Sequence, residues 1–287
     1  MWTIEYHEPR TTEETFQLLA RLGCDAKVIA GGQSLMVLLR QRIVDPEHLV
    51  NIKRIEELEY IRHNGKSVQI GALTTHRAIE TADIIRNKLP MLADAVSKLG
   101  SVQIRNWGTV GGTLCHADPA GDLAPMLIAL GSQIEIASAR GTRRLALEDF
   151  FQDYYETALE PDELLVEVGV PEPAADVRAC YIKNSIRMGD MAIVGVAVAL
   201  AIDENNRRCT SARVVVGAVD RTPIRLKEIE EALLGPVLER KALRDLCQDG
   251  IKNYHPLPDM HFSSDYKRTL MGVLIRDALE KLIFTHS

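Results

Sequence analysis

The chain has few cysteines, and their spacing fits neither a zinc site nor an iron–sulfur cluster. They lie far apart, at Cys24, Cys115, Cys180, Cys209 and Cys247, and no Cys-x-x-Cys pair occurs. Structural zinc sites and iron–sulfur clusters usually draw on closely spaced cysteines, so we expect neither in this chain. The five residues are predicted to be reduced and mostly buried thiols.

Long apolar runs and basic runs are also missing. The longest apolar stretch, residues 192–202, falls short of the ~20 residues that a membrane-spanning helix needs. The first residues lack the basic-then-apolar pattern of a signal peptide, so a cytoplasmic location is expected. The formal net charge of −6, without any Lys/Arg run, argues against a nucleic-acid partner.

Familiar catalytic motifs are absent as well. The sequence has no Gly-x-Gly-x-x-Gly dinucleotide motif, no P-loop and no Gly-x-Ser-x-Gly nucleophile motif. Carboxylate pairs such as Glu13-Glu14 are typical of solvated helix faces, and His76 is expected on a helix surface. We therefore predict no catalytic side chain, which suits a protein whose chemistry belongs to a bound redox cofactor.

Two glycine-rich segments are the most informative features present. Ala30-Gly-Gly-Gln-Ser-Leu35 separates a predicted strand at 27–30 from a predicted helix at 34–40, and Thr109-Val-Gly-Gly112 lies within a longer polar stretch, 105–122. Glycine lets the backbone approach a ligand, and successive exposed N–H groups can hold an anion such as phosphate. Each segment alone fits an ordinary turn equally well. Two such loops on separate elements could together cradle one extended nucleotide.

The second half of that stretch carries His116, Asp118 and Asp122. Metal ligation is conceivable for these residue types, but Pro119 and Gly121 indicate a turn and no partner cluster stands out elsewhere, so no metal site is predicted. Asp122 is expected either to cap the helix that begins near residue 123 or to accept a hydrogen bond from a ligand hydroxyl. The polar segment 183–190 fits either an exposed hairpin loop or a loop that faces the ligand.

The pattern of elements predicts three units. Residues 1–57 are predicted to form a small α/β unit. Residues 58–175 are predicted to form an α+β unit with a hairpin turn at Asn64-Gly65. The proline-rich stretch 171–176 marks the next boundary. Residues 176–287 contain predicted strands of one antiparallel sheet at 179–183, 192–202 and 212–219, and predicted helices at 225–234, 239–253 and 265–284.

Five segments in register resemble the FAD-binding (medium) subunit of the molybdenum hydroxylases, the family of carbon monoxide dehydrogenase, quinoline and nicotine dehydrogenases and xanthine dehydrogenase. These segments are residues 30–35, 109–112, 116–122, 160–165 and 183–190. The resemblance implies an α+β fold. Two N-terminal subdomains would hold FAD between them, as in vanillyl-alcohol-oxidase-like (PCMH-type) flavoproteins, followed by a C-terminal domain with a three-stranded sheet and helices.

By matched position, the resemblance also implies which residues contact FAD. The 30–34 loop would give N–H groups to the pyrophosphate and residues 109–113 would approach it from the other subdomain, while Asp122 would bind ribityl or adenosine hydroxyls. Met191 stands where carbon monoxide dehydrogenase relatives have a tyrosine near the flavin ring, so no ring-stacking partner is predicted. The implied cofactor-binding set is Lys27, Val28, Ile29, Ala30, Gly31, Gly32, Gln33, Ser34, Leu35, Thr109, Gly111, Gly112, Thr113, His116, Asp122, Leu164, Leu165, Lys183 and Asp190.

The resemblance implies partners too. A large subunit would carry the molybdopterin–molybdenum cofactor and a small subunit the [2Fe–2S] clusters, in a dimer of such heterotrimers. Electrons would leave through the FAD of this chain to an external acceptor. Two other interpretations stay open from the residues alone: a stand-alone FAD-dependent oxidoreductase of the same fold, and a non-catalytic nucleotide-binding module.

Overall fold

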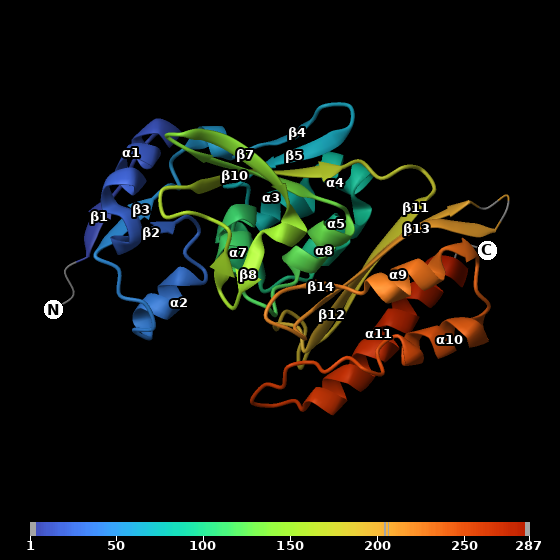
Figure 1. The fold of residues 1–287 in the computed structure, drawn as a ribbon. Coiled ribbons are helices and arrows are strands. Elements are labelled where there is room, and N and C mark those ends of the chain that lie inside the picture. Colours follow the sequence, from blue (N-terminus) through green and yellow to red (C-terminus); the bar gives the residue numbers. More distant parts are fainter. Residues whose placement is uncertain (1–3, 204, 206, 285–287) are drawn as a thin grey trace.

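The computed structural model describes residues 4–203, 205 and 207–284, which form three larger β-sheets surrounded by helices (Figure 1). The first sheet is parallel, with the strand order β1-β3-β2. Its strands are β1 (Glu5–His7), β2 (Ala26–Ile29) and β3 (His48–Asn51), and its helices are α1 (Thr12–Leu22) and α2 (Leu35–Arg40). The predicted order of strand, glycine loop and helix is thus confirmed for β2, residues 30–34 and α2.

Local sequence explains how this part forms. Thr11 caps α1, since its side chain accepts a hydrogen bond from the N–H of Glu14. Leu19 on α1 packs against Val50 of β3 in a buried cluster. A short 3₁₀ turn at Gly23–Asp25 joins α1 to β2, and another at Glu56–Leu58 leads from β3 to the second sheet.

The second sheet is antiparallel, with the order β4-β5-β10-β6-β7. Its strands are β4 (Ile61–His63), β5 (Ser67–Gly71), β6 (Gln133–Ser138), β7 (Gly141–Ala146) and β10 (Leu164–Pro171). The accompanying helices are α3 (His76–Thr81), α4 (Asp83–Lys88), α5 (Pro90–Ser97), α6 (Val102–Trp107), α7 (Val110–His116) and α8 (Leu123–Ala129). A 3₁₀ turn (Leu147–Asp149) leads to the small pair β8 (Phe151–Asp153) and β9 (Glu156–Thr157).

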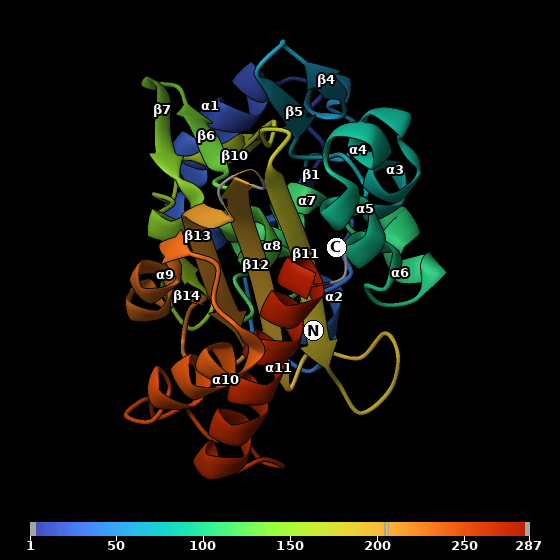
Figure 2. The same ribbon diagram turned by 90° about the vertical axis from the view of Figure 1, so that its right-hand side faces the viewer.

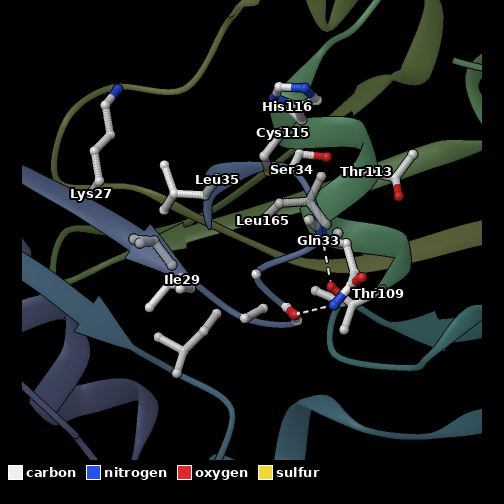
Figure 3. A pocket seen from close by; sticks show the side chains of 18 of the residues that line it. Lys27, Ile29, Gln33, Ser34, Leu35, Thr109, Thr113, Cys115, His116 and Leu165 are labelled. Carbon is white, nitrogen blue, oxygen red and sulfur yellow. Dashed lines mark hydrogen bonds between the residues drawn. The ribbon is translucent and has the colours of Figure 1, made fainter. Parts of the chain in front are cut away.

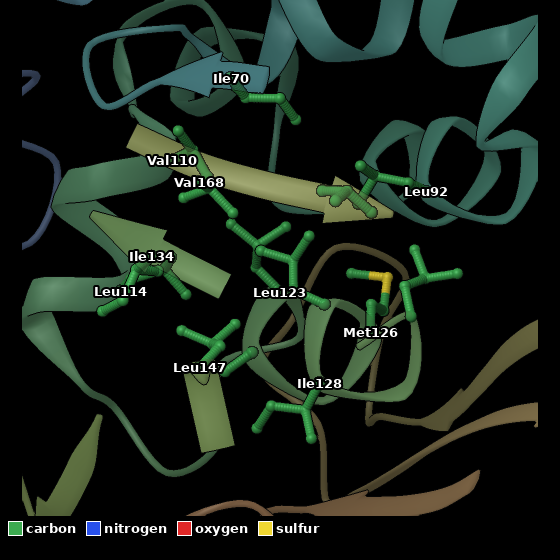
Figure 4. Close-up of a cluster of buried hydrophobic side chains, with 14 of the residues drawn as sticks. Ile70, Leu92, Val110, Leu114, Leu123, Met126, Ile128, Ile134, Leu147 and Val168 are labelled. Atoms are coloured by element: carbon green, nitrogen blue, oxygen red, sulfur yellow. The ribbon is translucent and has the colours of Figure 1, made fainter. Parts of the chain in front are cut away.

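A large hydrophobic core joins this sheet to its helices. Figure 4 shows Ile70 and Val168 from the strands facing Val110, Leu123 and Met126 from α7 and α8. Every residue of α8 is buried, because the helix lies between this core and strands β12 and β13 of the third sheet. A helix that is apolar all round requires such a two-sided setting.

The third sheet consists mainly of three long antiparallel strands (Figure 2). They are β11 (Val177–Asn184), β12 (Val194–Asp203) and β13 (Arg208–Gly217), and the two-residue strands β14 (Ile224–Arg225) and β15 (Gly235–Pro236) also pair with β13. The helices are α9 (Lys227–Leu233), α10 (Arg240–Asp249) and α11 (Ser264–Phe284). The predicted three strands and three helices are confirmed, with two short strands added at one edge.

Two further expectations can be compared with the fold. All five cysteines are free, and Cys180, Cys209 and Cys247 are buried while Cys24 is exposed, so the prediction of mostly buried thiols is confirmed. Among the helices of the described residues, none combines the length and the hydrophobicity that crossing a bilayer requires.

The expectation of a second glycine loop was wrong. The Thr109-Val-Gly-Gly112 segment is not an open loop but the cap and first turn of α7. The Thr109 side chain accepts a hydrogen bond from the N–H of Gly112 at 3.1 Å, which starts the helix in spite of the two glycines.

Candidate flavin site

A hollow lies where the β2–α2 loop faces α7 and the start of β10 (Figure 3). Its volume is about 290 Å³, near the lower end of the range typical of ligand pockets. Most predicted cofactor-binding residues line it together: Lys27, Val28, Ile29, Ala30, Gly31, Gly32, Gln33, Ser34, Leu35, Thr109, Gly111, Gly112, Thr113, His116, Leu164 and Leu165. Segments more than 70 residues apart in sequence are thereby brought to one place.

The 30–34 loop presents unused backbone donors to this hollow. Within the described residues, no hydrogen-bond partner is found for the N–H groups of Gly31, Gly32, Gln33 or Ser34. Gly32 has a φ of +69°, a conformation that glycine adopts without strain. Unpaired N–H groups in a curved loop between a strand and a helix suit a phosphate anion. The loop therefore fits the pyrophosphate of a dinucleotide.

On the α7 side, the N–H groups of residues 110–113 are already used within the protein. The N–H groups of Val110 and Gly111 already donate to the carbonyl oxygens of Thr74 and Ala72, at 3.0 and 2.9 Å. Residues 110–113 therefore do not form a second row of free N–H groups beside the 30–34 loop. A Cβ on Gly111 would come within 2.7 Å of the Ala72 Cβ, so the glycine allows α7 to pack tightly here. The Thr109 hydroxyl oxygen accepts a hydrogen bond from the Gly112 N–H, and the hydroxyl proton is available to donate to a ligand oxygen.

His76 is buried behind this wall, contrary to its expected surface position. Only 1% of it is exposed, and its Nε2 lies 2.8 Å from the Thr113 hydroxyl. Burial, assisted by the Arg105 charge, lowers the pKa of His76 to about 4, so the ring is neutral at neutral pH. Its backbone N–H donates to the Gly108 carbonyl at 2.9 Å. The residue thus supports both the turn before α7 and the pocket-lining Thr113.

His116 and Tyr155 form part of the pocket wall at the end of α7. Their ring centroids are 5.2 Å apart, and the Tyr155 hydroxyl donates to Asp118 at 3.3 Å. Burial lowers the pKa of His116, and the nearby Asp118 opposes that effect. Tyr155 was not predicted, because nothing in the local sequence distinguishes it from a surface tyrosine.

Three predicted residues do not line the pocket. The buried Asp122 carboxylate accepts hydrogen bonds from the Tyr181 hydroxyl and the Lys183 ammonium, each at 2.6 Å. Lys183 also donates to the backbone oxygen of Asp190 at 2.8 Å. The Asp122 side chain makes no capping bond to α8, so the capping prediction was wrong. The contacts of Asp122 with Tyr181 and Lys183 instead link the start of α8 to β11.

Several wall residues were missed by sequence reasoning. They are Leu38, Val44, Ile52, Ala72, Leu73, Gly108, Cys115, Tyr155, Leu159 and Glu163. Most are apolar residues that ordinary core positions also contain, so no local signal marks them. Glu163 is held by Arg143, through a hydrogen bond that keeps the pKa of the Glu163 carboxyl low.

Comparison with known families agrees with this geometry. Residues 2–173 match the FAD binding domain in molybdopterin dehydrogenase, and residues 179–282 match the CO dehydrogenase flavoprotein C-terminal domain. The chain is 34% identical to the alpha subunit of the 6-hydroxypseudooxynicotine dehydrogenase complex of Paenarthrobacter nicotinovorans, over 98% of this chain and 95% of that one. It is 33% identical to the carbon monoxide dehydrogenase medium chain of Afipia carboxidovorans, over 97% and 96%.

Solved structures show the same fold. Carbon monoxide dehydrogenase from Hydrogenophaga pseudoflava superimposes with a TM-score of 0.93 at 34% identity, covering 98% of this chain and 97% of that one. Quinoline 2-oxidoreductase from Pseudomonas putida 86 gives 0.92 at 31% identity, covering 98% and 96%. The predicted α+β fold class is confirmed. The chain belongs to the FAD-binding medium subunits of the molybdenum hydroxylases, and it is the flavoprotein subunit of an oxidoreductase.

Proposed function

We propose that this chain holds FAD between the 30–34 loop and α7, within a complex that also contains a large molybdopterin subunit and a small [2Fe–2S] subunit. When bound, FAD supplies the electron-transfer chemistry that connects the iron–sulfur clusters to an external acceptor. The row of unpaired N–H groups from Gly31 to Ser34, facing α7 across the pocket, carries the proposal.

The chain's own residues bind and position the cofactor. The loop N–H groups and the Thr109 hydroxyl would hold the pyrophosphate without a cation, which suits the formal net charge of −6. Ile29, Leu164 and Leu165 give the pocket an apolar wall that excludes water from the cofactor. No proton transfer by a side chain is required for this role.

Asp122, Lys183 and Asp190 take a different place in the proposal. Because they lie outside the pocket and bind one another, they would act on FAD only indirectly, by fixing α8 against β11. We also propose three units, at 1–57, 58–175 and 176–287. The gap between the two family matches supports the boundary near residue 175. Three hydrophobic clusters, each drawn mainly from one unit, support the division into three.

The relatives support a proposal for the subunit composition of the complex. The named dehydrogenase complexes and medium chains support a heterotrimer, and we propose a dimer of heterotrimers in the cytoplasm with an external electron acceptor. Purification of the native complex tests this. We expect a flavin absorption spectrum, a cysteine-rich small chain, and a large chain with molybdenum.

Each alternative gives a different result. A colourless protein would indicate a nucleotide-binding module without redox chemistry. A yellow protein that turns over alone, without iron or molybdenum in its native form, would indicate a stand-alone FAD oxidoreductase. Either result would overturn the proposed complex.

A further inference from the structure

Two histidines and a glutamate converge on one face of the first sheet, away from the flavin pocket. The parallel register places Glu5 of β1 directly opposite His48 of β3. His7 follows Glu5 by two residues, so its side chain emerges on the same face of β1. In Figure 1 the two strands lie side by side at the N-terminal end of the molecule.

The three side chains are arranged as metal ligands would be. His7 Nε2 lies 3.2 Å from His48 Nδ1. The two Glu5 carboxylate oxygens lie 3.7 Å from His7 Nε2 and 3.4 Å from His48 Nδ1 respectively. Ligand atoms bound tetrahedrally at the usual zinc distances of about 2.0–2.1 Å are separated from each other by roughly 3.3 Å. The observed separations are close to that value.

We propose that Glu5, His7 and His48 form a binding site for a divalent first-row transition-metal ion, with Zn²⁺ as the best match. Two imidazole nitrogens and one carboxylate oxygen make a ligand set that zinc commonly takes, with solvent in the fourth position. The imidazoles are held in place, with 13% and 19% of the His7 and His48 side chains exposed, whereas 66% of Glu5 is exposed. The glutamate thus completes the site from the solvent side.

The site has a structural consequence that is independent of FAD. β1 is an edge strand of only three residues, and β3 lies between it and β2. None of the three ligands lines the flavin pocket, which begins at Lys27 on β2. A bound ion would fasten β1 to β3. This inference departs from the sequence-based expectation that the chain has no metal site, because the two histidines are 41 residues apart.

The test uses the tag-free full chain with its FAD after treatment with a chelator. Titration with Zn²⁺ by calorimetry should show one saturable site, and the melting temperature should rise with the logarithm of free Zn²⁺. His7→Gln and His48→Gln should each weaken binding by at least ~10-fold, since removing even outer-shell partners of metal ligands costs that much. His255→Gln, at an exposed position, is the matched control and should bind like the parent protein.

Flavin content and far-UV circular dichroism establish that each variant remains folded. If either histidine variant fails to fold, Glu5→Gln provides the second test, because its side chain is mostly exposed, and it should also weaken binding. Absence of saturable Zn²⁺ binding to the parent protein, or equal affinity in folded His7→Gln and His48→Gln proteins, would overturn the proposal. The outcome does not depend on the proposed electron-transfer role.

Discussion

The backbone carbonyl of Trp107 closes directly over Gly31. A Cβ on Gly31 would overlap the Trp107 oxygen and lie 2.6 Å from the carbonyl carbon. The two residues precede α7 and α2 respectively, so this contact sets how closely the two sides of the flavin pocket approach. Lys53 lies 3.3 Å above the Trp107 ring centroid and adds a second link between the same parts.

This contact predicts that Gly31→Ala separates the walls of the pocket. Neither backbone segment can yield as a flexible side chain would, so we expect FAD affinity to fall by at least about tenfold, which corresponds to about 1.4 kcal/mol. Flavin absorbance per protein and the Kd for FAD measure the effect. Gly169→Ala is the matched control, because a Cβ there meets only the Gln133 oxygen at 3.9 Å. Equal FAD affinity in both variants would contradict the proposed role of the contact.

β-Branched substitutions at Gly32 and Gly111 should act by two different routes. Gly32→Val forces a side chain into a backbone with φ +69°, at a cost of about 1–2 kcal/mol. Gly111→Val drives atoms against Ala72, and overpacking typically costs about 1–3 kcal/mol. Both should lower FAD content while amide hydrogen exchange in β12 stays protected. Full flavin occupancy in either variant would show that the substituted glycine is not needed for FAD binding.

His76 should make the stability of the protein depend on pH. The pKa of its ring is lowered to about 4 in the folded protein, against about 6.5 when unfolded. The unfolded chain therefore binds the proton more readily between these values. Its contribution to stability is complete above pH 6.5 and is lost as pH falls toward 4, with a slope of up to about 1.4 kcal/mol per pH unit.

Denaturant unfolding of the parent and His76→Gln proteins between pH 4 and 7 measures this slope. Other groups titrate in the same range, so the difference between the two proteins is the informative quantity. The parent should lose stability more steeply on acidification than the variant. Parallel curves would mean that His76 is not held neutral by its burial.

Replacing only one partner of the Asp122–Lys183 ion pair should strongly lower the stability of the protein. Asp122→Asn leaves the largely buried Lys183 ammonium without its counter-charge, for which about 3–5 kcal/mol is typical. The double variant Asp122→Asn/Lys183→Met should recover much of that loss. Asp153→Asn, which breaks an exposed pair with Arg221, is the control and should change stability little.

The same variants test the indirect role of Asp122. If it supports the fold rather than contacting FAD, the folded fraction of the double variant should bind FAD with nearly the parent Kd. A large loss of FAD affinity in a double variant of restored stability would instead indicate that Asp122 contacts the cofactor directly.

Sequence by itself determined the features that depend on neighbouring residues. The apolar run of β2 followed by Gly31-Gly32 and Ser34 specifies strand, loop and helix, and Asn64-Gly65 specifies a hairpin. The alternating and helical patterns after residue 176 specify the last sheet and its helices. The matched segments also named the family, because five of them occur in one order.

Tertiary structure alone decided the partners of individual polar groups. Gly111 donates to Ala72, Asp122 meets Tyr181 and Lys183, and His76 is buried against Thr113. These partners, Gly111 and Ala72 included, are between 37 and 61 residues apart in sequence. The spacing of residues along the chain does not indicate which distant residues will pack together. A polar side chain such as Asp122 can therefore not be assigned from sequence as a helix cap, a ligand contact or one partner of a buried ion pair.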